Sequence, residues 1–98
     1  MQTSNTNGLP LFSLGNVYAT PDALDLLNEY GYPLMEILSR HERGDWGNLD
    51  PEDWEANQQA LKYGNRLFSS YRLKRKVKVW VITEADRSAT TLLLPDEY

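Results

Sequence analysis

Cysteine is absent from the 98-residue chain, and His41 is its one histidine. Without cysteine the protein forms no disulfide and offers neither a thiol nucleophile nor a thiolate metal ligand. A lone histidine also excludes the usual zinc sites. No apolar run reaches the roughly 18 to 20 residues that span a bilayer, and the polar start MQTSNTNG lacks the features of a secretory signal. We therefore expect a cytoplasmic protein that has no metal or cofactor and does not enter a membrane.

Basic residues are outnumbered, because 10 Lys and Arg stand against 14 Asp and Glu and give a net charge of −4. This balance argues against a general phosphate-binding surface. The charges are also separated along the chain, so we expect acids on one edge of the molecule and bases on another. The acidic cluster comprises Asp45, Asp50, Glu52, Asp53 and Glu55, and the basic cluster comprises Arg72, Lys74, Arg75, Lys76 and Lys78.

The C-terminal third carries the strongest strand signals. Two runs rich in β-branched residues, 77–83 and 90–94, flank a polar connection and predict a strand, a loop and a strand. The stretch 66–73 alternates between apolar and polar residues and predicts a further strand. One side of that strand comprises Leu67, Ser69, Tyr71 and Leu73. Joined by short turns, the three segments predict an antiparallel meander, with 11–18 as a possible fourth strand.

Three helices are predicted ahead of this meander. Thr20 and Pro21 mark the first start, because threonine caps an orphan backbone N–H and proline at the first position needs no donor. Gly31 supplies the left-handed residue that ends this helix. A second helix is expected over about 34–43, and a third, with the same cap-and-proline start, over about 50–63.

Together these elements predict an α+β fold. Three short helices are expected to pack on one face of an antiparallel β-meander of three to four strands. A chain of this length holds one hydrophobic core. We therefore expect residues 9–98 to form a single domain and residues 1–8 to form a flexible tail.

Catalytic chemistry could reside in His41 or in the polar loop from Glu84 to Thr91. A histidine near a helix end is suited to acid–base catalysis because its pKa lies near neutrality, and it equally stabilises a helix C-terminus. The loop could hold a phosphate through Arg87, or it is a turn in which Arg87 pairs with Glu84 or Asp86. No phosphate loop, nucleophile elbow or metalloprotease helix accompanies them. For both features the structural interpretation is preferred.

Two tryptophans, Trp46 and Trp54, lie within the acidic cluster. Aromatic side chains surrounded by charge are typical of protein interfaces. The acids do not have the spacing of a calcium loop, and acids at a helix N-terminus also have a purely structural use. We predict that Trp46 or Trp54 is exposed and that the partner-binding residues are Asp45, Trp46, Asp50, Glu52, Asp53 and Trp54.

Aromatic residues are interleaved with the basic cluster, namely Phe68, Tyr71 and Trp80. Cations and rings together suit a nucleic acid, whereas charges on a hairpin also protect a sheet edge from aggregation. The residues that could contact an anion or a nucleic acid are Arg72, Lys74, Arg75, Lys76 and Arg87. Because the chain is acidic overall, nucleic-acid contact is not the preferred interpretation.

Two motifs carry a resemblance to known proteins. The GDWG run at 44–47, and the pattern ITEADRS-x-TT-x-LLP-x-EY at 82–98, resemble a family of small bacterial proteins found on plasmids and prophages. The resemblance covers nearly the whole chain from Val17 and implies a mobile-element origin, without a particular activity. A fainter resemblance, to the fold of barnase and RelE-type toxins, implies helices ahead of an antiparallel sheet that carries ribonuclease residues.

The preferred hypothesis is a small acidic, non-catalytic binding protein. Its expected partner is a host protein such as a defence nuclease complex, which makes it of the anti-restriction or anti-CRISPR type. One alternative is a ribonuclease-like toxin domain in which His41 is the base, Arg87 stabilises the phosphorane and Thr90 or Thr91 orients the substrate. Those enzymes are usually basic, and this chain is acidic. A second alternative is a nucleic-acid-binding module that uses the basic hairpin at 72–78.

Overall fold

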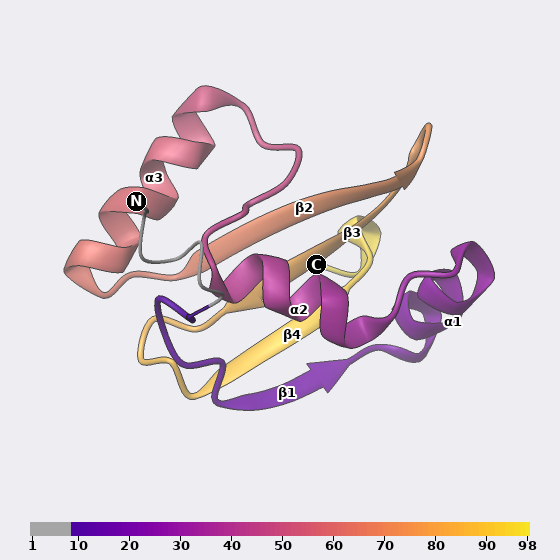
Figure 1. Ribbon diagram of the computed structural model, residues 1–98, viewed down its shortest axis with the longest axis horizontal. Coiled ribbons are helices and arrows are strands. Elements are labelled where there is room, and N and C mark those ends of the chain that lie inside the picture. Colours follow the sequence, from indigo (N-terminus) through magenta and orange to yellow (C-terminus); the bar gives the residue numbers. More distant parts are fainter. Residues whose placement is uncertain (1–8) are drawn as a thin grey trace.

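The computed structural model describes residues 9–98, in which three α-helices and four strands follow one another (Figure 1). The strands are β1 (Asn16–Ala19), β2 (Leu67–Lys74), β3 (Val77–Thr83) and β4 (Ala89–Leu93). The helices are α1 (Pro21–Tyr30), α2 (Leu34–Glu42), α3 (Pro51–Tyr63) and the short 3-10 helix η2 (Pro95–Glu97). The predicted α+β class is confirmed, and the tail expected over residues 1–8 lies outside the described residues.

The helices begin at the residues whose side chains close their first turns. Thr20 Oγ1 accepts a hydrogen bond from the Ala23 backbone N at 3.2 Å, and an Asp50 carboxylate oxygen accepts one from the Asp53 backbone N at 2.9 Å. Each bond satisfies a backbone N–H that has no partner within the helix and stabilises it by about 1 kcal/mol. Gly31 ends α1, as expected. The predicted starts of α1 and α3 are confirmed.

The sheet has the order β1-β4-β3-β2, in which β2, β3 and β4 form the predicted antiparallel meander. The possible fourth strand exists, but it is shorter than 11–18 and pairs with β4 in parallel, so the sheet is mixed. Gly15, with φ +64°, allows this pairing, because a Cβ there would lie 2.4 Å from the backbone of Ser88. The Asn16 backbone N then donates to the Ser88 carbonyl at 3.0 Å. As a result β1 begins beside the start of β4 and runs in the same direction.

Alternation along the strands gives the sheet two unlike faces. Helices α1 and α2 lie over one face (Figure 1), which is the helix-covered face. Its buried core comprises Ala23, Leu27, Ile37 and Leu38 of the helices with Tyr71, Leu73, Val79, Val81 and Leu92 of the sheet. The opposite face, called here the open face, carries Phe68, Ser70, Arg72, Lys78, Trp80, Ile82 and Leu93. Tyr98, after η2, packs against Trp80 on that side.

The outer edge of β2 is closed by polar groups from the preceding segment. The Asn57 side-chain amide of α3 donates to the Phe68 carbonyl at 2.6 Å and accepts from the Phe68 backbone N at 3.0 Å. Farther along, the Ser70 backbone N donates to the Trp46 carbonyl, and the Ser70 carbonyl accepts from the Asn48 backbone N. These contacts occupy the groups that an edge strand otherwise offers to another chain, and they hold α3 beside β2 (Figure 1).

Candidate functional site

His41 is fully buried on the helix-covered face, within a chain of hydroxyl groups. Its Nδ1 lies 2.6 Å from Ser69 Oγ, and its Nε2 lies 2.9 Å from Thr83 Oγ1. Thr83 Oγ1 lies in turn 2.7 Å from Thr90 Oγ1, which is 2.7 Å from the Leu14 carbonyl oxygen. Ser69 and Thr83 therefore contact the imidazole directly, and Thr90 and the Leu14 carbonyl extend the chain beyond Thr83.

The Leu14 carbonyl fixes the direction of every hydrogen bond in this chain. A carbonyl only accepts, so Thr90 donates to it, Thr83 donates to Thr90, and Nε2–H of His41 donates to Thr83. Nδ1 is then the acceptor for the Ser69 hydroxyl. Burial, and secondarily the charge of Arg87, lowers the pKa of His41 to about 3. The imidazole is therefore neutral near pH 7, with both nitrogens engaged.

This geometry argues against the ribonuclease alternative. The structure brings His41 and Thr90 into one network, as that alternative requires, but the network is internal and neither group faces solvent. A general base needs a free acceptor within reach of the substrate. Here the acceptor nitrogen already binds Ser69. We therefore assign these residues a structural role, which is to satisfy polar groups inside the core.

Arg87 also binds the protein's own backbone. Its guanidinium donates to the carbonyls of Asn65 at 2.7 Å, Ala85 at 3.0 Å, Glu84 at 3.1 Å and Ala60 at 3.1 Å. The expected pairing with the carboxylates of Glu84 or Asp86 is wrong. The Glu84 carboxylate lies 3.7 Å from Arg66, and Asp86 accepts from the Ser88 backbone N. Arg87 thus joins the end of α3 to the turn before β4, and the loop is held as a structural turn.

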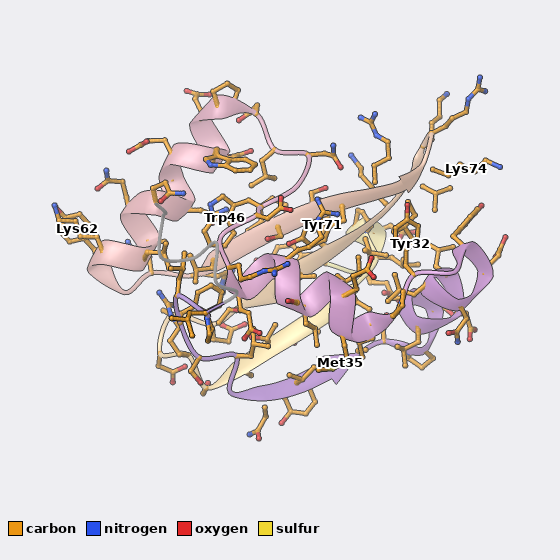
Figure 2. The ribbon with its side chains drawn as sticks, viewed as in Figure 1. Tyr32, Met35, Trp46, Lys62, Tyr71 and Lys74 are labelled. Atoms are coloured by element: carbon orange, nitrogen blue, oxygen red, sulfur yellow. The ribbon has the colours of Figure 1, made fainter. Side chains whose placement is uncertain are left out.

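The expectation of exposure is wrong for Trp46, which is fully buried. Its ring stacks on Phe12 at 6.2 Å and meets the His41 ring edge at 5.7 Å. The sharp turn depends on Gly47, with φ +78°, because a Cβ there would lie 2.2 Å from the Ser70 carbonyl oxygen. The GDWG motif therefore folds the loop back so that its tryptophan enters the core and its backbone closes the β2 edge. Figure 2 shows Trp46 between α3 and the sheet.

The acidic cluster divides into carboxylates with and without partners. Asp45 pairs with Arg40 at 2.7 Å and accepts from the Gly47 backbone N, Asp50 caps α3, and Glu55 accepts from Gln59. Within residues 9–98, the carboxylates of Glu52 and Asp53 make no ion pair or hydrogen bond. Trp54, in the same turns of α3, is exposed as expected. The carboxylates that remain available to a partner are therefore at the N-terminus of α3.

The open face carries a cluster of half-exposed rings. Phe68 and Trp80 meet edge to face, with their centroids 4.9 Å apart, and Tyr98 contacts Trp80 at 5.9 Å. Between them lies a hollow of about 280 Å³ lined by Arg66, Phe68, Trp80, Ile82 and Tyr98. Arg66 donates to the Tyr98 hydroxyl at 2.5 Å and so holds one wall in place. Such an apolar hollow with a polar rim is typical of binding surfaces.

A second hollow of about 330 Å³ lies on the other side of the same rings. Asp50 and Asp53 of α3 line one wall, and Phe68, Lys78 and Trp80 of the sheet line the other. The free carboxylate of Asp53 is thus adjacent to Phe68 and Trp80, which sequence reasoning grouped with the basic cluster and not with the acids. The part that sequence reasoning missed is Tyr98, because no local pattern placed it beside these rings.

The basic cluster lies at the end of the β2–β3 hairpin and on the adjoining part of the open face. Arg72, Lys74, Arg75, Lys76 and Lys78 are all exposed. Tyr71, which the interleaved pattern grouped with Phe68 and Trp80, is buried on the helix-covered face, where its hydroxyl donates to the Asp45 carbonyl at 2.6 Å. The rings and cations of the open face therefore come from alternate strand positions, and Arg87 is not among them.

Comparison with known proteins gives no relative for this arrangement. No protein-family model matches the chain, no curated protein matches it, and no solved structure matches it. Among residues 9–98, no helix has the length and apolar character required to cross a bilayer. The same part of the chain contains no group of three or more His, Asp or Glu residues placed to hold a metal ion. The surfaces of the fold are therefore the features that point to a function.

Proposed function

We propose that the chain is a small, non-catalytic binding protein that engages a partner protein through the open face and the adjoining N-terminus of α3. The observation that carries this proposal is the hollow between Phe68, Trp80 and Tyr98. The polar groups that could serve catalysis, in His41 and Arg87, are occupied within the fold. The half-exposed rings lack such an internal use.

The chemistry of the two hollows defines the partner. The first accepts one apolar side chain, whose burial contributes about 1.5 to 3 kcal/mol. That is too little for a stable complex, so further contacts are needed. The second hollow supplies them, because Asp50 and Asp53 line it opposite Lys78 and Trp80, and the unpaired Asp53 carboxylate favours a Lys or Arg. We therefore propose a partner segment in which an aromatic or aliphatic anchor is followed by a basic residue.

The resemblance to plasmid and prophage proteins suggests where such a partner belongs. A protein of mobile-element origin meets proteins of its host, and a defence nuclease complex is the partner we propose. The surface moves only in part from the one predicted: Asp50, Asp53 and Trp54 stay in or beside it, Trp46 leaves it because of burial, and Phe68, Trp80 and Tyr98 join it.

Photo-crosslinking from the open face tests the proposal. A photo-reactive amino acid at position 98 of the full chain is expected to capture a discrete protein from a bacterial lysate, whereas the same group at position 63 is not. Tyr98→Ala and Asp53→Lys are each expected to weaken binding of the captured protein by about 30-fold, the effect of losing an interface hot spot. Asp50 stays unchanged in these variants because it caps α3.

Tyr63→Ala is the matched control, because Tyr63 is 64% exposed, Tyr98 is 68% exposed, and Tyr63 lines neither hollow. Circular dichroism verifies that all variants fold. Equal capture at positions 98 and 63, or equal affinity of the captured protein for all variants, contradicts the proposal.

A further inference from the structure

Five cations gather at the projecting end of the β2–β3 hairpin, and we call them the cationic tip. They are Arg72, Lys74, Arg75, Lys76 and Lys78. Figure 1 shows this end of the hairpin projecting from the sheet between α1 and α3, and Figure 2 shows Lys74 there. Within residues 9–98, no member of the tip pairs with a carboxylate.

The register of the hairpin places two of these cations directly against each other. Arg72 and Lys78 are cross-strand partners on the open face. Like charges in that position destabilise a sheet, so the pair costs folding free energy that two neutral residues would not. A bulge between Arg72 and Lys74 shifts the register and brings Lys74 opposite Val77, with Arg75 and Lys76 as the turn. The fold thus concentrates the five charges instead of dispersing them.

Two of the five residues have contacts that hold them in place before any ligand arrives. The Arg72 backbone N donates to Asn48 Oδ1 at 2.8 Å, and the Lys74 ammonium lies 6.0 Å from the centre of the Tyr30 ring. A preorganised array of cations loses less freedom on binding than flexible side chains do. Preorganisation and unrelieved repulsion both point to an anionic ligand with several charges.

We propose that the cationic tip binds the phosphate backbone of a nucleic-acid duplex. No aromatic side chain lies among the five residues, and the nearest rings of the open face, Phe68 and Trp80, pack edge to face, so the tip itself offers charge and not a flat platform for stacking bases. Charge alone favours the ligand with the most closely spaced phosphates, which is a duplex, with about one charge per 1.7 Å of axis. Binding by this surface is therefore independent of base sequence. A partner protein bound to the open face could then keep a nucleic acid of its own bound, and that nucleic acid would lie against the tip.

The acidity of the whole chain does not cancel this attraction. The molecule is 35 Å along its longest axis, and Figure 1 places the β2–β3 turn on the side of α1 and α3 on the opposite side. Lys78 is the member of the tip nearest to the acids, because it lines one hollow together with Asp50 and Asp53. Charges separated by more than the screening length, about 8 Å at physiological ionic strength, interact weakly. The net charge of −4 therefore lowers long-range attraction more than it affects the contact itself.

Salt-dependent binding of a short mixed-sequence DNA duplex, followed by fluorescence anisotropy with the full chain, tests the inference. Each phosphate contact contributes about −0.9 to the slope of log K against log salt, so five contacts give a slope of up to about −4.5. Lys76→Gln is expected to reduce the slope by about 0.9, and Arg75→Gln with Lys76→Gln by about 1.8. Lys62→Gln is the matched control, because it removes one exposed cation from α3 and should leave the slope unchanged.

Other ligands and one further variant separate this inference from its rivals. Polyglutamate, anionic vesicles and single-stranded DNA of the same sequence are each expected to bind more weakly than the duplex. Tyr98→Ala should bind the duplex as the unaltered chain does, so that failure of the open face as a protein-binding surface leaves this result intact. The inference is overturned if the duplex does not bind at low salt, if the tip and control variants behave alike, or if any of the three rivals binds as tightly.

Discussion

The two faces of the sheet are built from the same strands and differ in how their polar groups are treated. On the helix-covered face, Ser69, Thr83 and Thr90 form a complete chain of hydrogen bonds with His41. On the open face, Arg72 and Lys78 oppose each other without an anion between them in the described part of the molecule. Neighbouring residues in one strand thus have different roles. The polar groups of the helix-covered face stabilise the fold, whereas the cations of the open face retain a repulsion that an anionic ligand would relieve.

This contrast explains why the residues that look catalytic are not at the surface. A buried polar group without a partner costs about 1 to 3 kcal/mol, so a core that contains one histidine and three hydroxyls must arrange all of them. The Leu14 carbonyl closes the chain and thereby sets each donor. Sequence alone offers His41, Arg87 and Thr90 as catalytic candidates, but in the structure His41 and Thr90 belong to one hydrogen-bond network inside the core and Arg87 binds backbone carbonyls.

Removing the imidazole is expected to have the largest effect on stability. His41→Ala deletes two hydrogen bonds, leaves the Ser69 hydroxyl unsatisfied and opens a cavity, so we expect a loss of about 4 kcal/mol in the free energy of unfolding. Urea denaturation measures it. Met35→Ala is the control from the same helix, because Met35 is 74% exposed and its truncation should cost less than about 0.5 kcal/mol. Similar losses for the two variants would show that the hydrogen-bond network of His41 makes no particular contribution to the free energy of unfolding.

Acid is expected to act on the same face with a smaller effect. The folded pKa of His41 is about 3, whereas the unfolded value is about 6.5, so between these limits the unfolded chain binds a proton that the folded chain does not. Stability therefore falls as the pH falls below about 6.5, and it loses about 2 kcal/mol by about pH 5.

Urea denaturation across that interval measures the slope, and His41→Gln is expected to flatten it. Nitrogen NMR of the folded protein should at the same time show an imidazole that is neutral and carries its proton on Nε2. An imidazole that titrates near pH 6.5 in the folded state would refute the assignment.

Local sequence signals predicted much of the fold. Thr20 and Asp50 cap their helices where expected, because a cap depends on two or three adjacent residues. The strand alternation placed Leu67, Ser69, Tyr71 and Leu73 on one side of their strand, and that side is buried, since a period of two needs no tertiary information. Pairing of β1 with β4 in parallel was beyond this reasoning, because it depends on a close approach of Gly15 to a segment more than 70 residues away.

The candidate site was less predictable than the fold. Burial of Trp46 and the engagement of Arg87 by four carbonyls are tertiary outcomes, and both residues sit in polar stretches that look exposed. The hollow on the open face depends on Tyr98 returning to Trp80 after η2, which no local pattern encodes. The basic cluster, by contrast, was visible because one hairpin keeps neighbouring residues together. What sequence could not show was that two of those cations, Arg72 and Lys78, are direct cross-strand partners.

The cross-strand pair of Arg72 and Lys78 supplies the test with the smallest expected effect, and that test discriminates best between the two faces. Arg72→Glu replaces a repulsive pair with an attractive one, so we expect the free energy of unfolding to rise by about 0.5 kcal/mol, and Arg72→Gln to give roughly half of that. Urea denaturation at low and high salt measures both, and the gain should shrink as salt screens the pair. The same variants should weaken duplex binding. A charge reversal that stabilises the protein while removing its ligand would show that this face is arranged for binding at the expense of stability, whereas a loss of stability in both variants would mean that Arg72 serves the fold after all.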